Sequence, residues 1–139
     1  MSSQQVKRDL ATVHLAIDNL PGTIAGFYSL CNFTVNANPL PEPVGRRLPR
    51  TAIPAHLLGY LGVSLDYKNQ GLGGVLVNAA VDAAESQTAV AASIGVVVHV
   101  LDEGLVAWYQ QIGFQRIPEH PLHLIMTMAD IRRLRAVER

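Results

Sequence analysis

The chain has 139 residues, an apolar fraction of 49%, no formal net charge at pH 7 and one cysteine, Cys31. This length favours a single domain, residues 1–139, and the composition excludes a disulfide-stapled secreted fold and a strongly basic nucleic-acid binder. No signal-peptide pattern and no apolar run of membrane-spanning length occurs, so we expect a cytoplasmic protein that does not enter a membrane.

Apolar periodicity predicts strands in the first half of the chain and an alternation of helices and strands in the second. In the first half we expect the end of a helix over 2–10, strands over 11–17 and 23–35 joined by a turn over 18–22, a proline-rich loop up to 54, and a strand over 55–65. A long helix should follow from 71 to about 92, and then a strand over 94–100 and a helix over 103–111. The chain should end with strands over 114–117 and 122–128 and a helix over 130–138.

The most informative segment is 57–76, LLGYLGVSLDYKNQGLGGVL. A run of strand-forming residues ends near Asp66, a turn with three glycines follows, and a helical pattern then begins. Backbone N–H groups at a helix N-terminus bind phosphate groups, and glycines permit their close approach. Two common phosphate motifs do not fit, because no Gly-Lys-Ser/Thr occurs here and Leu76 stands where a dinucleotide fingerprint needs glycine.

The remaining pattern, Lys68-Asn69-Gln70-Gly71-Leu72-Gly73, resembles the acetyl-CoA loop of the GNAT N-acetyltransferases, written Arg/Gln-x-x-Gly-x-Gly/Ala. Lys68 stands where the family usually has Arg or Gln; it keeps a donor and loses planar bidentate recognition. The segment 107–114, AWYQQIGF, resembles the family's helix-then-strand signature, in which a tyrosine precedes Gly-Phe. The distance between the two motifs leaves room for one helix and one strand, as that fold requires.

The resemblance implies an α/β (α+β) GNAT acyltransferase fold. Its sheet is mixed and mostly antiparallel, with splayed central strands and flanking helices. The family's N-terminal strand and helices are expected to be largely missing from this chain, because only 2–10 precedes its first predicted strand.

At a finer level the chain is similar to the GNAT toxins of type II toxin–antitoxin pairs, which acetylate aminoacyl-tRNA. The matching pieces are 50–54 (RTAIP), 70–73 (QGLG), 98–103 (VHVLDE) and Pro121-Leu122. This similarity implies acetyl transfer from acetyl-CoA to the α-amino group of aminoacyl-tRNA, which blocks translation. It also implies a small antitoxin as partner and a homodimer.

The same resemblance assigns roles to individual residues. Tyr109 is expected to protonate the leaving thiolate as general acid, and the backbone of Leu61 and Val63 to pair with the pantetheine arm. The pyrophosphate would bind the N–H groups from Gln70 to Val75, with Lys68 as a point charge. The full set of expected acetyl-CoA-binding residues is Leu61, Gly62, Val63, Lys68, Asn69, Gln70, Gly71, Leu72, Gly73, Gly74, Val75 and Trp108.

Basic residues gather in two places that could contact RNA phosphates. Arg46, Arg47 and Arg50 lie in the proline-rich loop and are the predicted tRNA-binding residues. The tail arginines at 132, 133, 135 and 139 favour a helix C-terminus and solubility instead.

The histidines leave several interpretations open. We expect His99 to be a buried or half-buried structural residue rather than a base, whereas His56 could be either. His120 and His123 make no metal-ligand spacing with a cysteine or a third histidine, so no metal is expected. Asp102 and Glu103 fit an N-cap and a first-turn acid of the next helix.

Two other functions remain open from the sequence. The first is a GNAT acetyltransferase of a small-molecule or protein amine, and the second is an inactive module that binds CoA or a protein partner.

Overall fold

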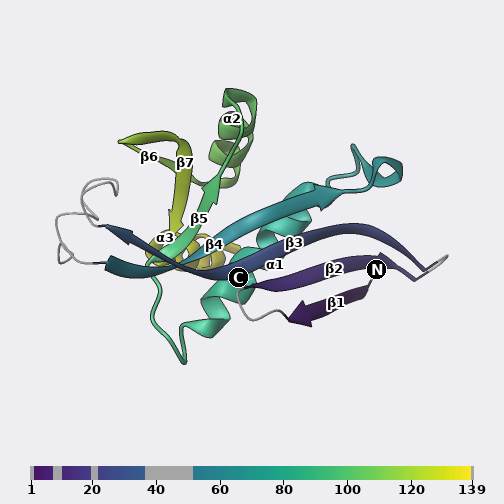
Figure 1. Ribbon diagram of the computed structural model, residues 1–139, viewed down its shortest axis with the longest axis horizontal. Coiled ribbons are helices and arrows are strands. Elements are labelled where there is room, and N and C mark those ends of the chain that lie inside the picture. Colours follow the sequence, from purple (N-terminus) through teal and green to yellow (C-terminus); the bar gives the residue numbers. More distant parts are fainter. Residues whose placement is uncertain (1, 8–10, 20–21, 37–51, 139) are drawn as a thin grey trace.

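The computed structural model describes residues 2–7, 11–19, 22–36 and 52–138, and these form one seven-stranded sheet with three α-helices (Figure 1). The elements are β1 (Ser2–Lys7), β2 (Thr12–Asp18), β3 (Thr23–Asn36), β4 (Ala52–Val63), a single helical turn η2 (Leu65–Tyr67), α1 (Leu72–Gln87), β5 (Gly95–His99), α2 (Glu103–Ile112), β6 (Gln115–Ile117), β7 (His120–Thr127) and α3 (Met128–Glu138). None of the helices among these residues is long and apolar enough to cross a membrane.

The strand order is β1-β2-β3-β4-β5-β7-β6, and every neighbouring pair is antiparallel except β4 with β5. This confirms the predicted mixed, mostly antiparallel sheet. Figure 1 shows β4 and β5 side by side at one end and far apart at the other, where β5 turns away with β7, β6 and α2. Among the described strands, the sheet therefore opens at its one parallel pair.

The prediction of a helix end over 2–10 is wrong where the structure describes that segment. Residues 2–7 form the edge strand β1, which pairs with β2 in a regular antiparallel register from Ser2↔Ile17 to Lys7↔Thr12. Strand formation depends on a partner strand more than on intrinsic preference, and a short polar segment carries no periodicity that shows this partner. Within the described residues, no α-helix precedes α1.

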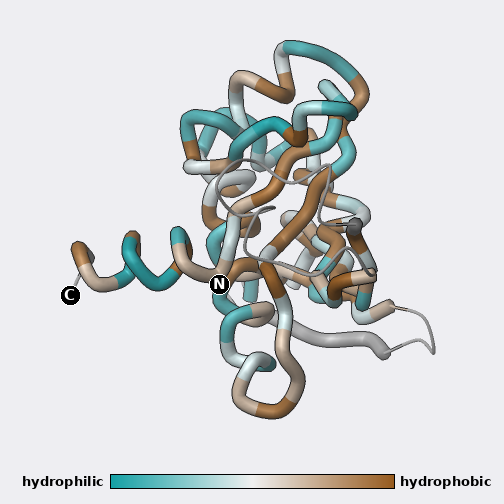
Figure 2. Tube along the Cα trace, turned by 90° about the vertical axis from the view of Figure 1, so that its left-hand side faces the viewer, coloured by the Kyte–Doolittle hydropathy of each residue, from teal (hydrophilic) through white to brown (hydrophobic). Residues whose placement is uncertain are grey.

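The main core lies between one face of the sheet and the three helices. Val96 and Val98 of β5 pack on this face with Leu76 and Val77 of α1 and Val106 of α2. On the opposite face, the fully buried Val97 belongs to a smaller cluster, as the alternation of side chains along a strand requires. Figure 2 shows hydrophobic stretches in the middle of the molecule and the C-terminal end of α3 at the left edge of the view.

Local chemistry explains where two helices begin and end. α1 stops at Gln87, five residues before the predicted end, because Ser86 and Thr88 hydrogen-bond the carbonyls of Ala83 and Glu85 with their own hydroxyls. α2 begins after Asp102, whose carboxylate accepts a 2.9 Å hydrogen bond from the Leu105 amide. The sequence-based prediction of Asp102 as N-cap and Glu103 as first-turn acid is confirmed.

Candidate functional site

The glycine-rich turn between β4 and α1 presents the N-terminus of a 16-residue helix. Asn69 and Gly71 both adopt left-handed backbone conformations, with φ angles of 64° and 78°. This reverses the chain tightly before α1 begins at Leu72, and glycine or asparagine tolerates such a conformation best. The amides of Leu72, Gly73 and Gly74 have no acceptor within the helix, so they can bind an anion. The Val75 amide, also expected to bind the pyrophosphate, instead donates to the Gly71 carbonyl at 3.3 Å.

Trp108 of α2 lies directly against this turn. A Cβ atom added at Gly73 would lie 3.3 Å from Trp108 Cζ2, whereas one added at Gly74 would meet nothing within 4 Å. Glycine at 73 is therefore set by close packing between the start of α1 and the indole ring. This contact joins the helix N-terminus to α2 across the opening of the sheet.

The strand edge next to this turn is open. β4 and β5 pair only at His56↔Val96, Leu57↔Val97 and Leu58↔Val98, although β4 continues to Val63. A bulge where β4 pairs with β3 lies at the same place, and the Tyr60 amide donates to Ser29 Oγ at 2.9 Å.

Backbone directions follow from the hydrogen bonds on either side of the bulge. The amides of Tyr60 and Ser64 both donate toward β3, the second to the Ala25 carbonyl at 2.8 Å. Because N–H groups alternate in direction along a strand, those of Leu61 and Val63 point toward the open side. An extended ligand could therefore pair with β4 in place of a further strand.

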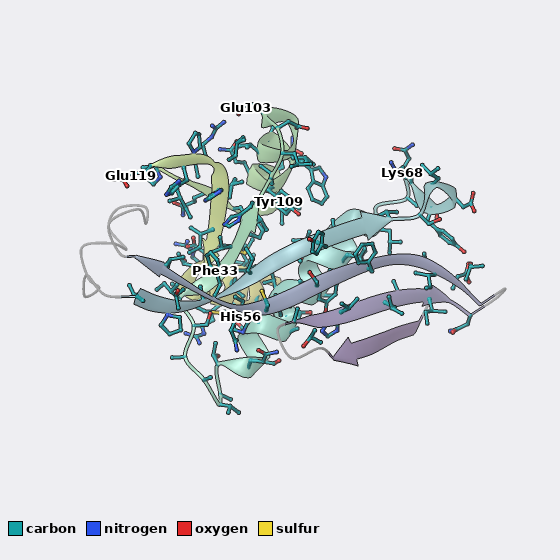
Figure 3. All side chains as sticks on the ribbon, viewed as in Figure 1. Phe33, His56, Lys68, Glu103, Tyr109 and Glu119 are labelled. Atoms are coloured by element: carbon teal, nitrogen blue, oxygen red, sulfur yellow. The ribbon has the colours of Figure 1, made fainter. Side chains whose placement is uncertain are left out.

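A cleft of about 640 Å³ joins these features. Its lining includes nine of the twelve residues expected to bind acetyl-CoA: Leu61, Val63, Lys68, Asn69, Gly71, Leu72, Gly73, Gly74 and Trp108. Figure 3 shows Lys68 beyond the end of β4 and Tyr109 on the other side of the opening, at the lower end of α2.

Three expected residues do not line this cleft, each for a local reason. A Cβ atom at Gly62 would lie 2.4 Å from the Phe27 ring, so packing on the opposite face of the sheet explains this glycine. The side-chain amide of Gln70 turns back toward the Asp66 carbonyl, 3.4 Å away. Val75 is on the exposed side of α1, with 60% of its surface accessible.

Two lining residues, Tyr67 and Leu105, were missed by sequence reasoning. Leu105 lies one helical turn before Trp108 on α2, so the helical spacing from Trp108 was the available signal. The Tyr67 hydroxyl donates to Asp18 Oδ2 at 2.5 Å and lies 3.3 Å from Thr23 Oγ1. The hydrogen bond to Asp18 raises the pKa of Tyr67 and fixes its ring beside the turn, a tertiary contact with no local sequence signal.

Tyr109, the predicted general acid, is not part of the cleft lining; it is buried on α2 next to Trp108, with 6% of its surface exposed. Its ring packs edge-on against Trp108 and Phe114, with ring centroids 4.9 and 5.2 Å away. Burial raises the pKa of Tyr109 to about 12, because the phenolate form loses its hydration. Among the described residues, no group hydrogen-bonds the Tyr109 hydroxyl, so its proton is available to a bound ligand.

His56 and His99 have different environments. His56 is 4% exposed, and its ring nitrogens hydrogen-bond Ser93 Oγ at 2.9 Å and Gln87 Oε1 at 2.8 Å. It therefore ties β4 to the end of α1 and the following loop. His99 is exposed and stacks on His123, so the expectation of a buried or half-buried residue is wrong. Its position at the end of β5, where the sheet opens, exposes it.

The predicted RNA-binding residues Arg46, Arg47 and Arg50 lie outside the described residues, as does Arg139. The other tail arginines make contacts within the fold: Arg135 pairs with Asp82 and Glu85 of α1, Arg133 with Asp130, and Arg132 donates to Thr88. In addition, Arg116 and Glu103 form an ion pair at 2.5 Å between β6 and the start of α2. Within the described residues, no group of three or more His, Cys, Asp or Glu side chains could hold a metal ion.

The cleft therefore combines an anion-binding helix N-terminus, a lysine and an open strand edge, and the buried Tyr109 packs against its lining residue Trp108. The donors in the cleft fit the pyrophosphate and the pantetheine amides of a CoA thioester.

Comparisons with known proteins agree with this fit. Residues 4–114 match the family described as the acetyltransferase (GNAT) family. A probable toxin TacT from Sinorhizobium fredii is 30% identical over 139 aligned positions, which cover 92% of this chain and 75% of the relative. A tRNA-acetylating toxin from Mycobacterium tuberculosis is 34% identical over 116 positions, covering 81% of this chain and 68% of the relative.

Solved structures share the fold. AtaT complexed with acetyl-methionyl-tRNAfMet superposes with a TM-score of 0.83 at 24% identity, covering 90% of this chain and 75% of that one. A structure of AtaTR bound with acetyl-CoA gives a TM-score of 0.75 at 25% identity, covering 90% and 74%.

Proposed function

The chain belongs to the GNAT acetyltransferase family, and we propose that it is a toxin that acetylates the α-amino group of aminoacyl-tRNA and so blocks translation. One domain, residues 1–139, is proposed to carry this activity. As a member of this family it is an acetyl-CoA-dependent N-acetyltransferase. The acceptor is proposed from its similarity to a tRNA-acetylating toxin at 34% identity.

One observation supports the chemistry above all others. The cleft places the first turn of α1 and the open edge of β4 side by side, with Lys68, Leu61 and Val63 all in its lining. An extended, phosphorylated ligand can satisfy both groups of N–H donors at once. Holding the acyl donor in one orientation removes much of the entropic cost of meeting the amine.

Each residue group has a separate task in the proposed mechanism. Acetyl-CoA supplies an activated acetyl thioester. The amides of the first turn of α1 and the Lys68 ammonium bind phosphate oxygens. The amide of Val63 points to the open side of β4, where it would stabilise negative charge that develops on the acetyl oxygen.

Tyr109 is proposed as the general acid: the amine forms the new N–C bond, the C–S bond breaks, and the departing sulfur takes the phenol proton, which is replaced by the proton that the acetylated amine releases. Its pKa of about 12 keeps the phenol protonated throughout the physiological range. An α-amino group with a pKa of about 7.7–8.0 is partly neutral near pH 7, so attack does not require a dedicated base. Tyr109 is therefore the side chain that the mechanism uses for proton transfer.

Two alternatives have different supports. Acetylation of a small or protein amine is compatible with the same cleft, because the described residues that line it are those proposed to bind the acyl donor, not the acceptor. A CoA-binding module without activity is the second alternative, because the cleft alone is sufficient to bind CoA.

Further parts of the proposal concern the cell. Both substrates are cytoplasmic, so we place the protein there. A small antitoxin is proposed as partner, by analogy with the solved structure of the AtaT Y144F mutant toxin bound to the C-terminus of the antitoxin AtaR. Pairing of two copies is proposed from family resemblance, and sedimentation velocity at several protein concentrations tests it.

Growth arrest on induced expression tests the toxin function. We expect the wild-type chain to stop growth and Tyr109→Phe to relieve the arrest at an equal protein level. Tyr28→Phe is the matched control, because Tyr28 is a second buried tyrosine, 5% exposed, whose ring stacks on His14 rather than packing against the cleft residue Trp108. A wild-type chain that leaves growth unchanged while it acetylates free amines would favour the first alternative.

A further inference from the structure

A hydrogen bond from Tyr67 ties the turn between β4 and α1 to a neighbouring hairpin. Residues 65–71, here called the phosphate turn, lead into the free amides at the start of α1. The Tyr67 hydroxyl donates to Asp18 Oδ2 at 2.5 Å and lies 3.3 Å from Thr23 Oγ1. Asp18 ends β2, Thr23 begins β3, and the two residues pair across this hairpin. Figure 1 shows the turn after β4 at the same end of the molecule as the end of β2 and the start of β3.

The other side chains of the phosphate turn do not fasten it to the sheet. Within the described part of the chain, the side chains of Lys68 and Asn69 make no hydrogen bond or ion pair. The Gln70 amide donates to the Asp66 carbonyl, which belongs to the same turn. Asn69 and Gly71 hold left-handed backbone conformations, and fixing such a segment costs conformational entropy. A tether that fixes it in advance therefore matters for binding.

Tyr67 is placed to act on the cleft through the turn. Its ring packs on the main core and lines the cleft next to Lys68, the cation expected to meet the phosphate oxygens. A hydroxyl has one proton to donate, and that of Tyr67 goes to the Asp18 carboxylate. The phenol therefore does not donate to a phosphate as well. Its contribution to binding comes from the shape that it gives to the phosphate turn.

We propose that the hydrogen bond between Tyr67 and Asp18 holds the phosphate turn in the shape that binds the pyrophosphate of acetyl-CoA, which makes both of them positioning residues for the acyl donor. This inference deepens the proposed function and rests on its acetyl-CoA site, but not on the choice of acceptor. A turn that is already ordered does not have to be ordered when the ligand binds, so less of the interaction energy is lost. The tether should therefore raise the affinity without touching the ligand.

The charge of Asp18 gives the inference a test of sign. The hydrogen bond to Asp18 raises the pKa of Tyr67, and the charges of Asp18 and Asp66 add to this shift, so the phenol stays protonated and keeps its role as donor. Carboxylates beside a phosphate site repel the ligand. If Asp18 acted through its charge alone, removing it would tighten the binding of acetyl-CoA. If it acts through Tyr67, removing it weakens binding.

A double-mutant cycle on acetyl-CoA binding tests the tether. Tyr67→Phe removes only the donor hydroxyl, and Asp18→Ala removes the acceptor. Each variant should raise the Kd, measured by isothermal titration at fixed salt, by about two- to tenfold, the range that one hydrogen bond typically supports. Asp18 has further interactions, but these are absent from both members of the comparison in the Asp18→Ala background. In that background, Tyr67→Phe should leave the Kd unchanged.

Two comparisons distinguish positioning of the phosphate turn from general support of the fold. S-acetylpantetheine lacks the pyrophosphate, so its Kd, measured by NMR titration, should be the same for wild type and Tyr67→Phe. Tyr60→Phe is the matched control, because Tyr60 is a 72% exposed tyrosine of β4 that does not line the cleft. It should leave the Kd for acetyl-CoA unchanged.

Hydrogen exchange in the ligand-free chain reports the tether directly. The amides of Tyr67, Lys68 and Val75 are hydrogen-bonded to carbonyls within residues 64–71. Their exchange should be faster in Tyr67→Phe than in wild type, while exchange in β7 stays the same. A raised Kd with unchanged exchange at these amides would overturn the inference, because the turn would have kept its shape.

The binding outcomes separate this inference from the proposed function. An unchanged Kd for acetyl-CoA in Tyr67→Phe, or a lower Kd in Asp18→Ala, would overturn the tether and leave the toxin function standing. Equal losses for acetyl-CoA and S-acetylpantetheine would also overturn it. A Kd that depends on Tyr67 and Asp18 as a pair, in a chain that acetylates no charged tRNA, would support the tether and count against the proposed function.

Discussion

The same substitution, glycine to alanine, should change the Tm differently at Gly73 and Gly74, the two neighbouring glycines at the start of α1. Alanine at either position removes backbone freedom from the unfolded chain and favours the helix by about 0.5–1 kcal/mol. At Gly74 nothing lies within 4 Å of the added Cβ atom, so this gain should appear in full. For a chain of this length, it corresponds to an increase in Tm of about 2–3 °C.

At Gly73 the added Cβ atom would lie 3.3 and 3.5 Å from two carbon atoms of the Trp108 ring. The ring must move by a few tenths of an ångström, and this loss of packing costs about as much as the helix gains. We therefore expect Gly73→Ala to leave the Tm unchanged or lower it. Because Trp108 lines the cleft, the same variant should also bind acetyl-CoA more weakly.

Thermal unfolding followed by circular dichroism measures the first effect, and isothermal titration with acetyl-CoA measures the second. A double variant, Gly73→Ala with Trp108→Ala, should recover the helix gain relative to Trp108→Ala alone. If Gly73→Ala raises the Tm as much as Gly74→Ala does, the close contact between α1 and α2 at the cleft is refuted.

Three further predictions concern single residues. Tyr109→Phe should lower kcat by about a hundred- to ten-thousandfold with little change in KM. Burial raises the pKa of Tyr109 to about 12, so the phenol stays protonated as the pH rises. The kcat of the wild type should therefore show no loss from ionisation of Tyr109 between pH 8 and about pH 11. His56→Ala should lower the free energy of unfolding by about 2–4 kcal/mol, since it leaves a cavity and two polar groups without their partner; a loss below about 1 kcal/mol in urea denaturation would argue against that buried network. Gly62→Ala should lower the Tm in the wild-type background but not with Phe27→Ala, because a Cβ atom at 62 would lie 2.4 Å from the Phe27 ring; equal losses in both backgrounds would assign Gly62 another role.

Much of the fold was predictable because its signals are local. The strand–turn–helix order around Gly71 and Gly73, the N-cap at Asp102 and the Gly-Phe after α2 each depend on residues a few positions apart. The order of these elements along the chain, compared with that of the family, then predicts how the strands are arranged in the sheet. The splayed pair β4 and β5 follows from this order, and with it the position of the cleft.

The errors arise where the outcome depends on a distant partner. Residues 2–7 form a strand because β2 lies beside them, and this pairing has no local signature. Gly62 lies in a glycine-rich segment that suggested ligand binding, but the structural reason for glycine at this position is the nearby ring of Phe27 on the next strand. Tyr67 enters the cleft because Asp18, far away in sequence, holds its hydroxyl. His99 is exposed because the sheet opens beside it, which a strand pattern alone does not reveal.

Transfer of radiolabelled acetyl from acetyl-CoA to a pool of charged tRNA, with free amines in parallel, tests the proposed function most directly. We predict label on the aminoacyl-tRNA that is lost with Tyr109→Phe and retained with Tyr28→Phe. Label on free amines alone, or no label despite measurable acetyl-CoA binding, would contradict the proposed acceptor and leave a different acetyltransferase or an inactive CoA-binding module.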